Sequence, residues 1–183
     1  MGRERFVTLC LVALLFASCA TTISSSTGPT AAQARAASKL PDFELNSVEG
    51  DSVRLSDHLG REVVLLAFWD TWCEPCKTEL PLLDRIYRAH KDQGLAVFAI
   101  SMDDPSTAMQ VAPYAHENGF AFGVLLDPNG KAANLYNTHK SAPYTVIIGR
   151  DGTIAHEATG FDPASAKSLE DRIEKLLAAA APQ

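Results

Sequence analysis

The chain is poor in cysteine, in positive charge and in long apolar runs. It holds 4 cysteines among 183 residues, and its 16 lysines and arginines are outnumbered by 22 aspartates and glutamates, for a formal net charge of −6. This balance argues against nucleic-acid binding and leaves no basic patch for anionic lipid. The apolar run at residues 6–17 is too short to span a bilayer.

The first 19 residues predict an export signal, because two arginines precede the apolar run and small residues follow it. LFASC at its end resembles the lipobox of bacterial lipoproteins, which is cleaved before a cysteine that then carries lipid. Cys19 is the implied lipidation site, although Phe16 stands where the lipobox usually has leucine. Ordinary signal cleavage near Ala20 is the alternative. Both place the protein outside the cytoplasm, in the cell envelope.

Residues 20–38 are rich in Ser, Thr, Ala and Gly without an apolar period, so we expect a flexible tether there. Residues 39–183 have the length of one domain with a substantial core. Cys10 would leave with the signal, and Cys19 would take the lipid. Only Cys73 and Cys76 therefore remain for disulfide chemistry in the folded domain.

The hydrophobic pattern predicts an α/β domain with a mixed central sheet between layers of helices. Continuous apolar runs are typical of strands buried on both faces, and short alternating stretches around turn residues are typical of hairpins. We expect buried strands at residues 61–70, 95–101 and 122–127, and hairpins at 43–55 and 144–159. Helices are predicted at 74–93, at 131–137 and after Asp162, with a helical stretch at 105–119 broken by Pro113.

The motif FWDTWCEPCKTELP, residues 68–81, places Cys73 and Cys76 at the predicted junction of a buried strand and a helix. The first turn of a helix offers free N–H groups and a partial positive charge, which favour a thiolate. Cys73 is therefore the predicted nucleophile. Cys76, one turn later, is the predicted resolving thiol that displaces a mixed disulfide.

The motif resembles the active site of the thioredoxin superfamily, in particular its exported TlpA/ResA-like branch. The likeness covers residues 40 to about 178, including PDFEL, LLDPNGKAANLYN and SAPYTVIIGRDGTIAHEATGF. It implies a thioredoxin-like three-layer sandwich with an N-terminal hairpin. It also implies a cis-proline at Pro143 facing the disulfide, with Ala142 pairing to a partner's extended chain. Trp72 and Pro75 would help to bind substrate.

Thioredoxin carries a buried aspartate where this chain has Ala67, so another group must accept the proton of Cys76. The candidates are Glu74, between the cysteines, and Asp103 or Asp104 after the second buried strand. A carboxylate at Glu74 would also raise the pKa of Cys73, which predicts a reducing couple.

Other interpretations were weighed. A structural disulfide closing so small a loop would stabilise little. A zinc site lacks a second cysteine pair. Copper binding would need His139 beside the cysteines, and a peroxidase would need threonine where Asp70 stands, since Thr71 is one position out of register. We expect Lys77 and Glu79 to be solvated helix charges, with contact between Lys77 and the Cys73 thiolate as an alternative for Lys77.

The sequence thus predicts an exported thiol:disulfide oxidoreductase, of the reductase type, that needs no metal or organic cofactor. The expected partners are oxidised exported proteins such as apocytochrome c, and a membrane electron donor of the DsbD/CcdA kind implied by the resemblance. The protein is expected to be a monomer that contacts the membrane through its N-terminal lipid. Copper delivery and peroxidase activity remain the alternatives.

Overall fold

The computed structural model describes residues 40–179. The predicted export signal, Cys19 and the predicted tether lie outside the described residues. Within residues 40–179, no helix combines the length and apolar character that crossing a membrane requires.

Seven strands form one mixed sheet in the order β2-β1-β5-β4-β3-β6-β7. The central strands β3, β4 and β5 are parallel, and the remaining pairings are antiparallel. The strands are β1 (Glu44–Ser47), β2 (Ser52–Arg54), β3 (Val63–Trp69), β4 (Leu95–Ser101), β5 (Gly123–Leu126), β6 (Tyr144–Ile148) and β7 (Ile154–Thr159). Both predicted hairpins are present, as β1–β2 and β6–β7.

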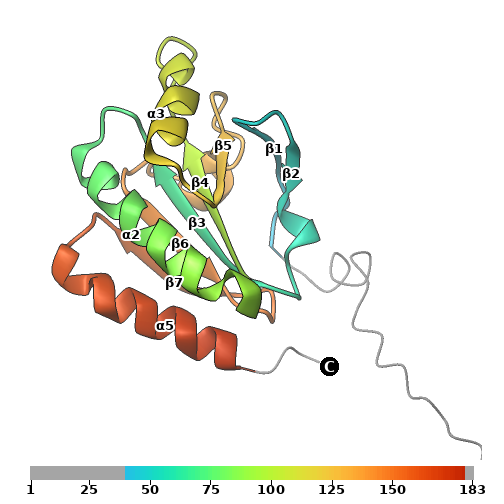
Figure 1. Cartoon of the computed structure of the whole chain (residues 1–183). Coiled ribbons are helices and arrows are strands. Elements are labelled where there is room, and N and C mark those ends of the chain that lie inside the picture. The colour runs from blue at the N-terminus through green and yellow to red at the C-terminus, as the bar shows by residue number, and fades with distance from the viewer. Residues whose placement is uncertain (1–39, 180–183) are drawn as a thin grey trace, which may run out of the picture.

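Helices cover both faces of this sheet. They are α2 (Glu74–His90), α3 (Val111–Asn118), α4 (Ala133–Tyr136) and α5 (Ala166–Ala178), with short 3-10 turns η1 (Leu55–Asp57), η2 (Lys91–Gln93), η3 (Ala108–Gln110) and η4 (Pro163–Ser165). In Figure 1, α2 and α5 run across one face of the sheet. Residues of α4 and η1 pack on the other face, so the predicted three-layer sandwich is confirmed.

The two faces of β3 supply two separate cores, because successive side chains of a strand point to opposite sides. Val63, Leu65 and Trp69 pack with α2, α3 and α5. Val64, Leu66 and Phe68 pack with the N-terminal strands and α4. All seven residues of β3 are buried, which explains the uninterrupted apolar run in the sequence.

Pro113 was predicted to break a helix, but it does not. It lies in the first turn of α3, where a proline's missing N–H has no helical partner to lose. The α-helix is shorter than the predicted range 74–93, because α2 ends at His90. The chain then forms the 3-10 turn η2, which ends at Gly94 with a left-handed φ of 89°. Asp162 caps a short 3-10 turn before α5.

Candidate active site

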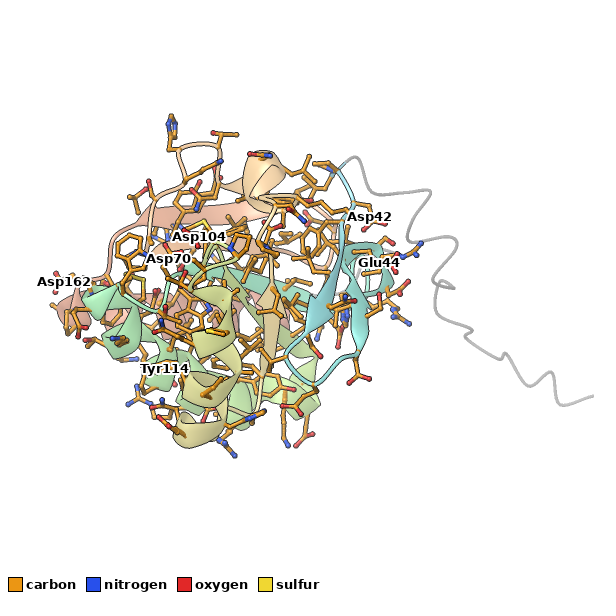
Figure 2. All side chains as sticks on the ribbon, turned by 90° about the horizontal axis from the view of Figure 1, so that it is seen from above. Asp42, Glu44, Asp70, Asp104, Tyr114 and Asp162 are labelled. Carbon is orange, nitrogen blue, oxygen red and sulfur yellow. A yellow bond between two sulfur atoms is a disulfide. The ribbon has the colours of Figure 1, made fainter. Side chains whose placement is uncertain are left out.

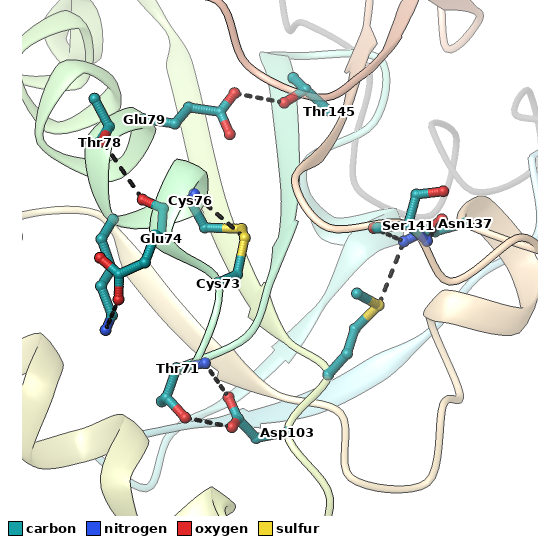
Figure 3. The surroundings of a disulfide bond; sticks show 12 residues. Thr71, Cys73, Glu74, Cys76, Thr78, Glu79, Asp103, Asn137, Ser141 and Thr145 are labelled. Atoms are coloured by element: carbon teal, nitrogen blue, oxygen red, sulfur yellow. Dashed lines mark hydrogen bonds and ion pairs between the residues drawn. A yellow bond between two sulfur atoms is a disulfide. The ribbon is translucent and has the colours of Figure 1, made fainter.

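Cys73 and Cys76 form a disulfide at the start of α2, with Cα atoms 5.3 Å apart. Cys73 is the N-cap residue, and the backbone N–H of Cys76 donates to its sulfur at 3.3 Å. Cys76 is fully buried, whereas Cys73 retains 4% exposure. Cys73 is thus the less buried partner of the bond, which Figure 3 shows at the start of the helix.

The chain reaches this position through a tight connection from β3. The backbone N–H of Cys73 donates to the carbonyl of Asp70 at 3.0 Å, so the loop turns straight into the helix. This places the Cys73 sulfur at the N-terminal end of a 17-residue helix. Free N–H groups and the helix dipole at that end stabilise negative charge on sulfur.

Glu74, Pro75 and Trp72 surround the disulfide on the solvent side. The Glu74 carboxylate is 81% exposed and accepts a hydrogen bond from the Lys77 ammonium at 2.9 Å. Figure 3 shows its side chain turned away from the two sulfurs. Trp72 is 69% exposed, and Pro75 is exposed in the first turn of α2. The surface position of Glu74 suits an electrostatic modulator better than a proton acceptor for buried Cys76.

Glu79 is buried, and its interpretation as a solvated charge was wrong. It follows Cys76 by three residues on the inner face of α2, and the Thr145 hydroxyl donates to its carboxyl at 2.9 Å (Figure 3). Burial raises the pKa of Glu79 to about 7, and the hydrogen bond from Thr145 opposes that rise. Its spacing from buried Cys76 and Leu83 is a helical signal that could have identified it.

Asp103, a predicted proton acceptor, is buried behind the site. Its carboxylate accepts from the backbone N–H of Thr71 at 2.9 Å, from the Thr71 hydroxyl at 2.5 Å and from the Ser101 hydroxyl at 3.0 Å. These contacts hold the loop that precedes Cys73, as Figure 3 shows. Both oxygens of Asp103 thus accept hydrogen bonds that hold this loop in place.

Asp70 and Asp104 occupy opposite environments, because Asp70 is buried and Asp104 is exposed. Asp70 is buried, and burial, followed by the nearby Asp103 carboxylate, raises the pKa of Asp70 to about 6. Asp104 is exposed, and hydrogen bonds from Ser106 lower its pKa. An exposed carboxylate of lowered pKa is a poor acceptor for a buried thiol, so Asp104 is a turn residue in this structure.

The Ala142–Pro143 peptide bond is cis, as the resemblance implied. The loop before it is held by buried Asn137, whose side chain donates to the Ser141 carbonyl at 2.8 Å and accepts from the Ser141 N–H at 3.0 Å. Figure 3 shows Asn137 and Ser141 across the site from Cys73. Sequence reasoning missed Asn137, because its partner lies in an irregular loop.

The geometry does not favour the two alternative chemistries. Where a peroxidase would need threonine, Asp70 is a buried carboxyl, and the hydroxyl of Thr71 is bonded to Asp103. His139, required for copper, lies exposed in its loop. Within residues 40–179, three metal-ligand side chains meet only at His90, Glu170 and Glu174, so no histidine joins the cysteines in a three-ligand group.

A redox disulfide at a helix start, facing a cis-proline loop on this α/β fold, defines a thioredoxin-like thiol-disulfide oxidoreductase. Residues 36–157 match the model of the AhpC/TSA family. The chain is 34% identical to thiol-disulfide oxidoreductase ResA of Geobacillus kaustophilus over 123 residues, 67% of this chain and 68% of that protein. The chain therefore belongs to the AhpC/TSA family, among thiol-disulfide oxidoreductases of the ResA type.

Further relatives agree with this assignment. Thiol-disulfide oxidoreductase ResA of Oceanobacillus iheyensis is 36% identical over 147 residues, 78% of this chain and 71% of that protein. A Chlorobium tepidum structure described as a thiol:disulfide interchange protein DsbE superposes with a TM-score of 0.69 and 33% identity, covering 77% of this chain and 96% of that one. An exposed lipoprotein thioredoxin of Streptococcus pneumoniae gives a TM-score of 0.63 at 27% identity, covering 74% and 100%.

Proposed function

We propose that this oxidoreductase works as a reductase of disulfides in exported proteins, anchored to the membrane by lipid on Cys19. The observation that carries the direction is the carboxylate of Glu74, which lies between the two cysteines in the sequence. The nearby cation, Lys77, is paired with Glu74, which limits its stabilisation of a Cys73 thiolate. A poorly stabilised Cys73 thiolate favours the disulfide form of the enzyme, which makes its dithiol a good electron donor.

The reaction begins with reduced enzyme. The Cys73 thiolate attacks one sulfur of the substrate disulfide, the substrate S–S bond breaks, and the released substrate thiolate takes a proton. Enzyme and substrate are then joined through Cys73. The helix N-terminus favours the Cys73 thiolate for this attack, because Cys73 caps α2.

Glu79 supplies the proton acceptor for the second step. Its carboxylate takes the proton of the Cys76 thiol, the Cys76 thiolate attacks the Cys73 sulfur, and the substrate leaves as its second thiol after gaining a proton. Two electrons have moved to the substrate, and the enzyme holds the disulfide seen here. Glu79 also lines a cavity of about 200 Å³ with His156, Ser168 and Arg172, which offers its proton a route to solvent.

Substrate would dock across the exposed rim of the site. Trp72 offers apolar surface, and Ala142 makes no backbone hydrogen bond within residues 40–179, which leaves its peptide groups for an extended partner chain. A depression of about 430 Å³ continues from Thr71 and Lys77 to Met109 and Tyr114. Tyr114 of α3, labelled in Figure 2, lines this depression, and the Lys77 ammonium lies 6.0 Å from its ring centre.

The proposed electron donor is a membrane protein of the DsbD/CcdA kind, and the proposed clients include apocytochrome c. Support for lipid anchoring comes from the LFASC sequence and from the S. pneumoniae relative, which is itself described as a lipoprotein. The short tether would keep the active site close to a membrane donor. We propose a monomeric enzyme whose redox reaction uses no metal and no organic cofactor.

Trapping in the native envelope tests this function. A Cys76→Ser variant cannot resolve the mixed disulfide, so it should accumulate adducts that reductant releases. The matched control, with Cys73→Ser as well, should trap nothing. Adducts with proteins carrying haem-binding CxxCH motifs would support the apocytochrome role. A broad set of clients would instead support general reduction of exported proteins. The proposal would be refuted if the Cys76→Ser variant captured no exported protein, or if the double variant captured as much as the single one.

A further inference from the structure

The far end of α2 carries a cluster that the redox reaction does not use. His90 ends α2, and Glu170 and Glu174 project from α5 toward it. One ligand atom from each of the three lies within 4.8 Å of the other two. Fourteen residues of helix separate His90 from Cys76, about 21 Å at 1.5 Å per residue. The cluster is therefore separate from the active site.

His90 is held in place and lacks a hydrogen-bonding partner. Its side chain is nine-tenths buried, at 10% exposure, and its Nδ1 atom is buried without any hydrogen bond. Its other ring nitrogen, Nε2, faces the Glu174 carboxylate at 3.8 Å, too far for a hydrogen bond. Nε2 therefore lies on the side of the carboxylates without a hydrogen bond to them, while Nδ1 is buried and unpartnered.

The two glutamates are four residues apart on α5, so they occupy the same face of that helix and repel each other. Within the described part of the chain, the only ion pair of either is the long contact of Glu174 with His90. The neighbouring cation, Lys167, is committed to Asp171 at 2.6 Å. A dication between the carboxylates would remove their repulsion and give Nε2 a strong partner.

We propose that His90, Glu170 and Glu174 bind Zn²⁺ or a similar divalent transition metal. One imidazole nitrogen and two carboxylates are ligands that suit Zn²⁺, and water would complete the coordination, since both glutamates reach solvent. The metal would join the end of α2 to α5, which run side by side in Figure 1. This role is structural, and it stands independently of the proposed redox function.

Calorimetric titration of the oxidised, chelator-treated full chain with Zn²⁺ tests the site. The disulfide form is used because free thiols would bind zinc themselves. Wild-type protein should bind one Zn²⁺, and its melting temperature should rise with added Zn²⁺. The Glu170→Gln, Glu174→Gln double variant, altered at solvent-reaching positions, should weaken binding by at least the 10- to 100-fold typical of supporting residues.

His116→Ala is the matched control, because His116 also faces a single carboxylate, Glu49 at 2.7 Å, but lies outside the cluster. It should bind Zn²⁺ as the wild type does, whereas His90→Ala should lose binding. If His90→Ala fails to fold, the double glutamine variant alone decides. No binding by the wild type at millimolar Zn²⁺, or unchanged binding by the double variant, would overturn the proposal.

Discussion

The hydroxyl of Thr145 donates a hydrogen bond to the carboxyl of Glu79 at 2.9 Å, joining α2 to β6 beneath the disulfide. Thr145 follows Pro143 by two residues, and Glu79 follows Cys76 by three. One buried contact therefore connects the helix that begins at the cysteines with the strand that directly follows the cis-proline. A change in the protonation state of Glu79 can therefore affect both this helix and this strand.

Replacing this carboxyl should slow release of substrate from the mixed disulfide. With Glu79→Gln, we expect the single-turnover rate of the Cys76-dependent step to fall about 100-fold at pH 7.5, the lower end of general-base effects. In the wild type that rate should rise with pH through about 7, as the Glu79 carboxyl loses its proton. Stopped-flow tryptophan fluorescence measures it. Glu74→Gln is the control, and an equal loss there would contradict the assignment.

The same acid should make the folded protein less stable as pH rises. Burial holds the pKa of Glu79 at about 7, above the 4.5 of an unperturbed glutamate, so between these values the folded chain keeps a proton that the unfolded chain has lost. Stability is then fully present at low pH and declines through pH 7, by an upper limit of about 3 kcal/mol. Asp70, with its pKa raised to about 6, acts in the same direction.

Urea unfolding of the oxidised protein between pH 5 and 8 measures this decline. Glu79→Gln should flatten the curve between about pH 5 and 7, while Asp70→Asn should remove the part at lower pH. A free energy of unfolding that climbs from pH 5 to 7 would mean that other groups dominate.

Much of this molecule could be predicted from the sequence, because its central strands are buried on both faces. Such strands have uninterrupted apolar runs, as in β3, and the turn residues between them mark the hairpins. The redox role of the cysteine pair could also be predicted, because Cys-x-x-Cys at a strand–helix junction is typical of redox-active thiols. Local pattern and local chemistry agreed there.

What could not be predicted depends on contacts between distant residues. Glu79 was interpreted as solvated because glutamate is almost always exposed, and only the position of Thr145 explains its burial. The bonds from Thr71 to Asp103 join residues 32 apart, and they add a structural role to a residue expected only as a proton acceptor. No local pattern encodes either pairing, because one forms only when α2 packs on β6, and the other only when the loops after β3 and β4 meet.

The charge pair on the helix surface should set the reduction potential. The Glu74 carboxylate disfavours the Cys73 thiolate, and Lys77 partly neutralises it at 2.9 Å. We expect a wild-type potential near the about −270 mV of thioredoxin, a rise of roughly 10–20 mV in Glu74→Gln and a fall of similar size in Lys77→Gln. Equilibration with dithiothreitol or glutathione measures it. A wild-type value near the about −120 mV of DsbA would defeat the reductase proposal.

Asp103 should matter for the stability of the site loop and not for proton transfer. Asp103→Ala leaves the buried N–H and hydroxyl of Thr71 without an acceptor, so we expect a loss of about 1–3 kcal/mol in the free energy of unfolding. Asp103→Asn keeps one acceptor and should lose less. In both variants the pH dependence of the Cys76 step should persist, and its disappearance in Asp103→Asn would identify Asp103 as the proton acceptor.

Trp72 should discriminate between protein and small-molecule substrates. Its side chain is 69% exposed beside Cys73, so it can contact a docked protein without contributing to the buried core. Trp72→Ala should lower kcat/KM for insulin reduction about tenfold, as expected when a buried aromatic contact worth more than 1 kcal/mol is lost. Reduction of a small aromatic disulfide by the pre-reduced enzyme should change less than twofold, because that substrate needs only the Cys73 sulfur. Ile154→Ala, an exposed apolar residue of β7 outside that docking surface, is the control. Equal losses with both substrates would show that Trp72 acts on the cysteine itself and not on docking.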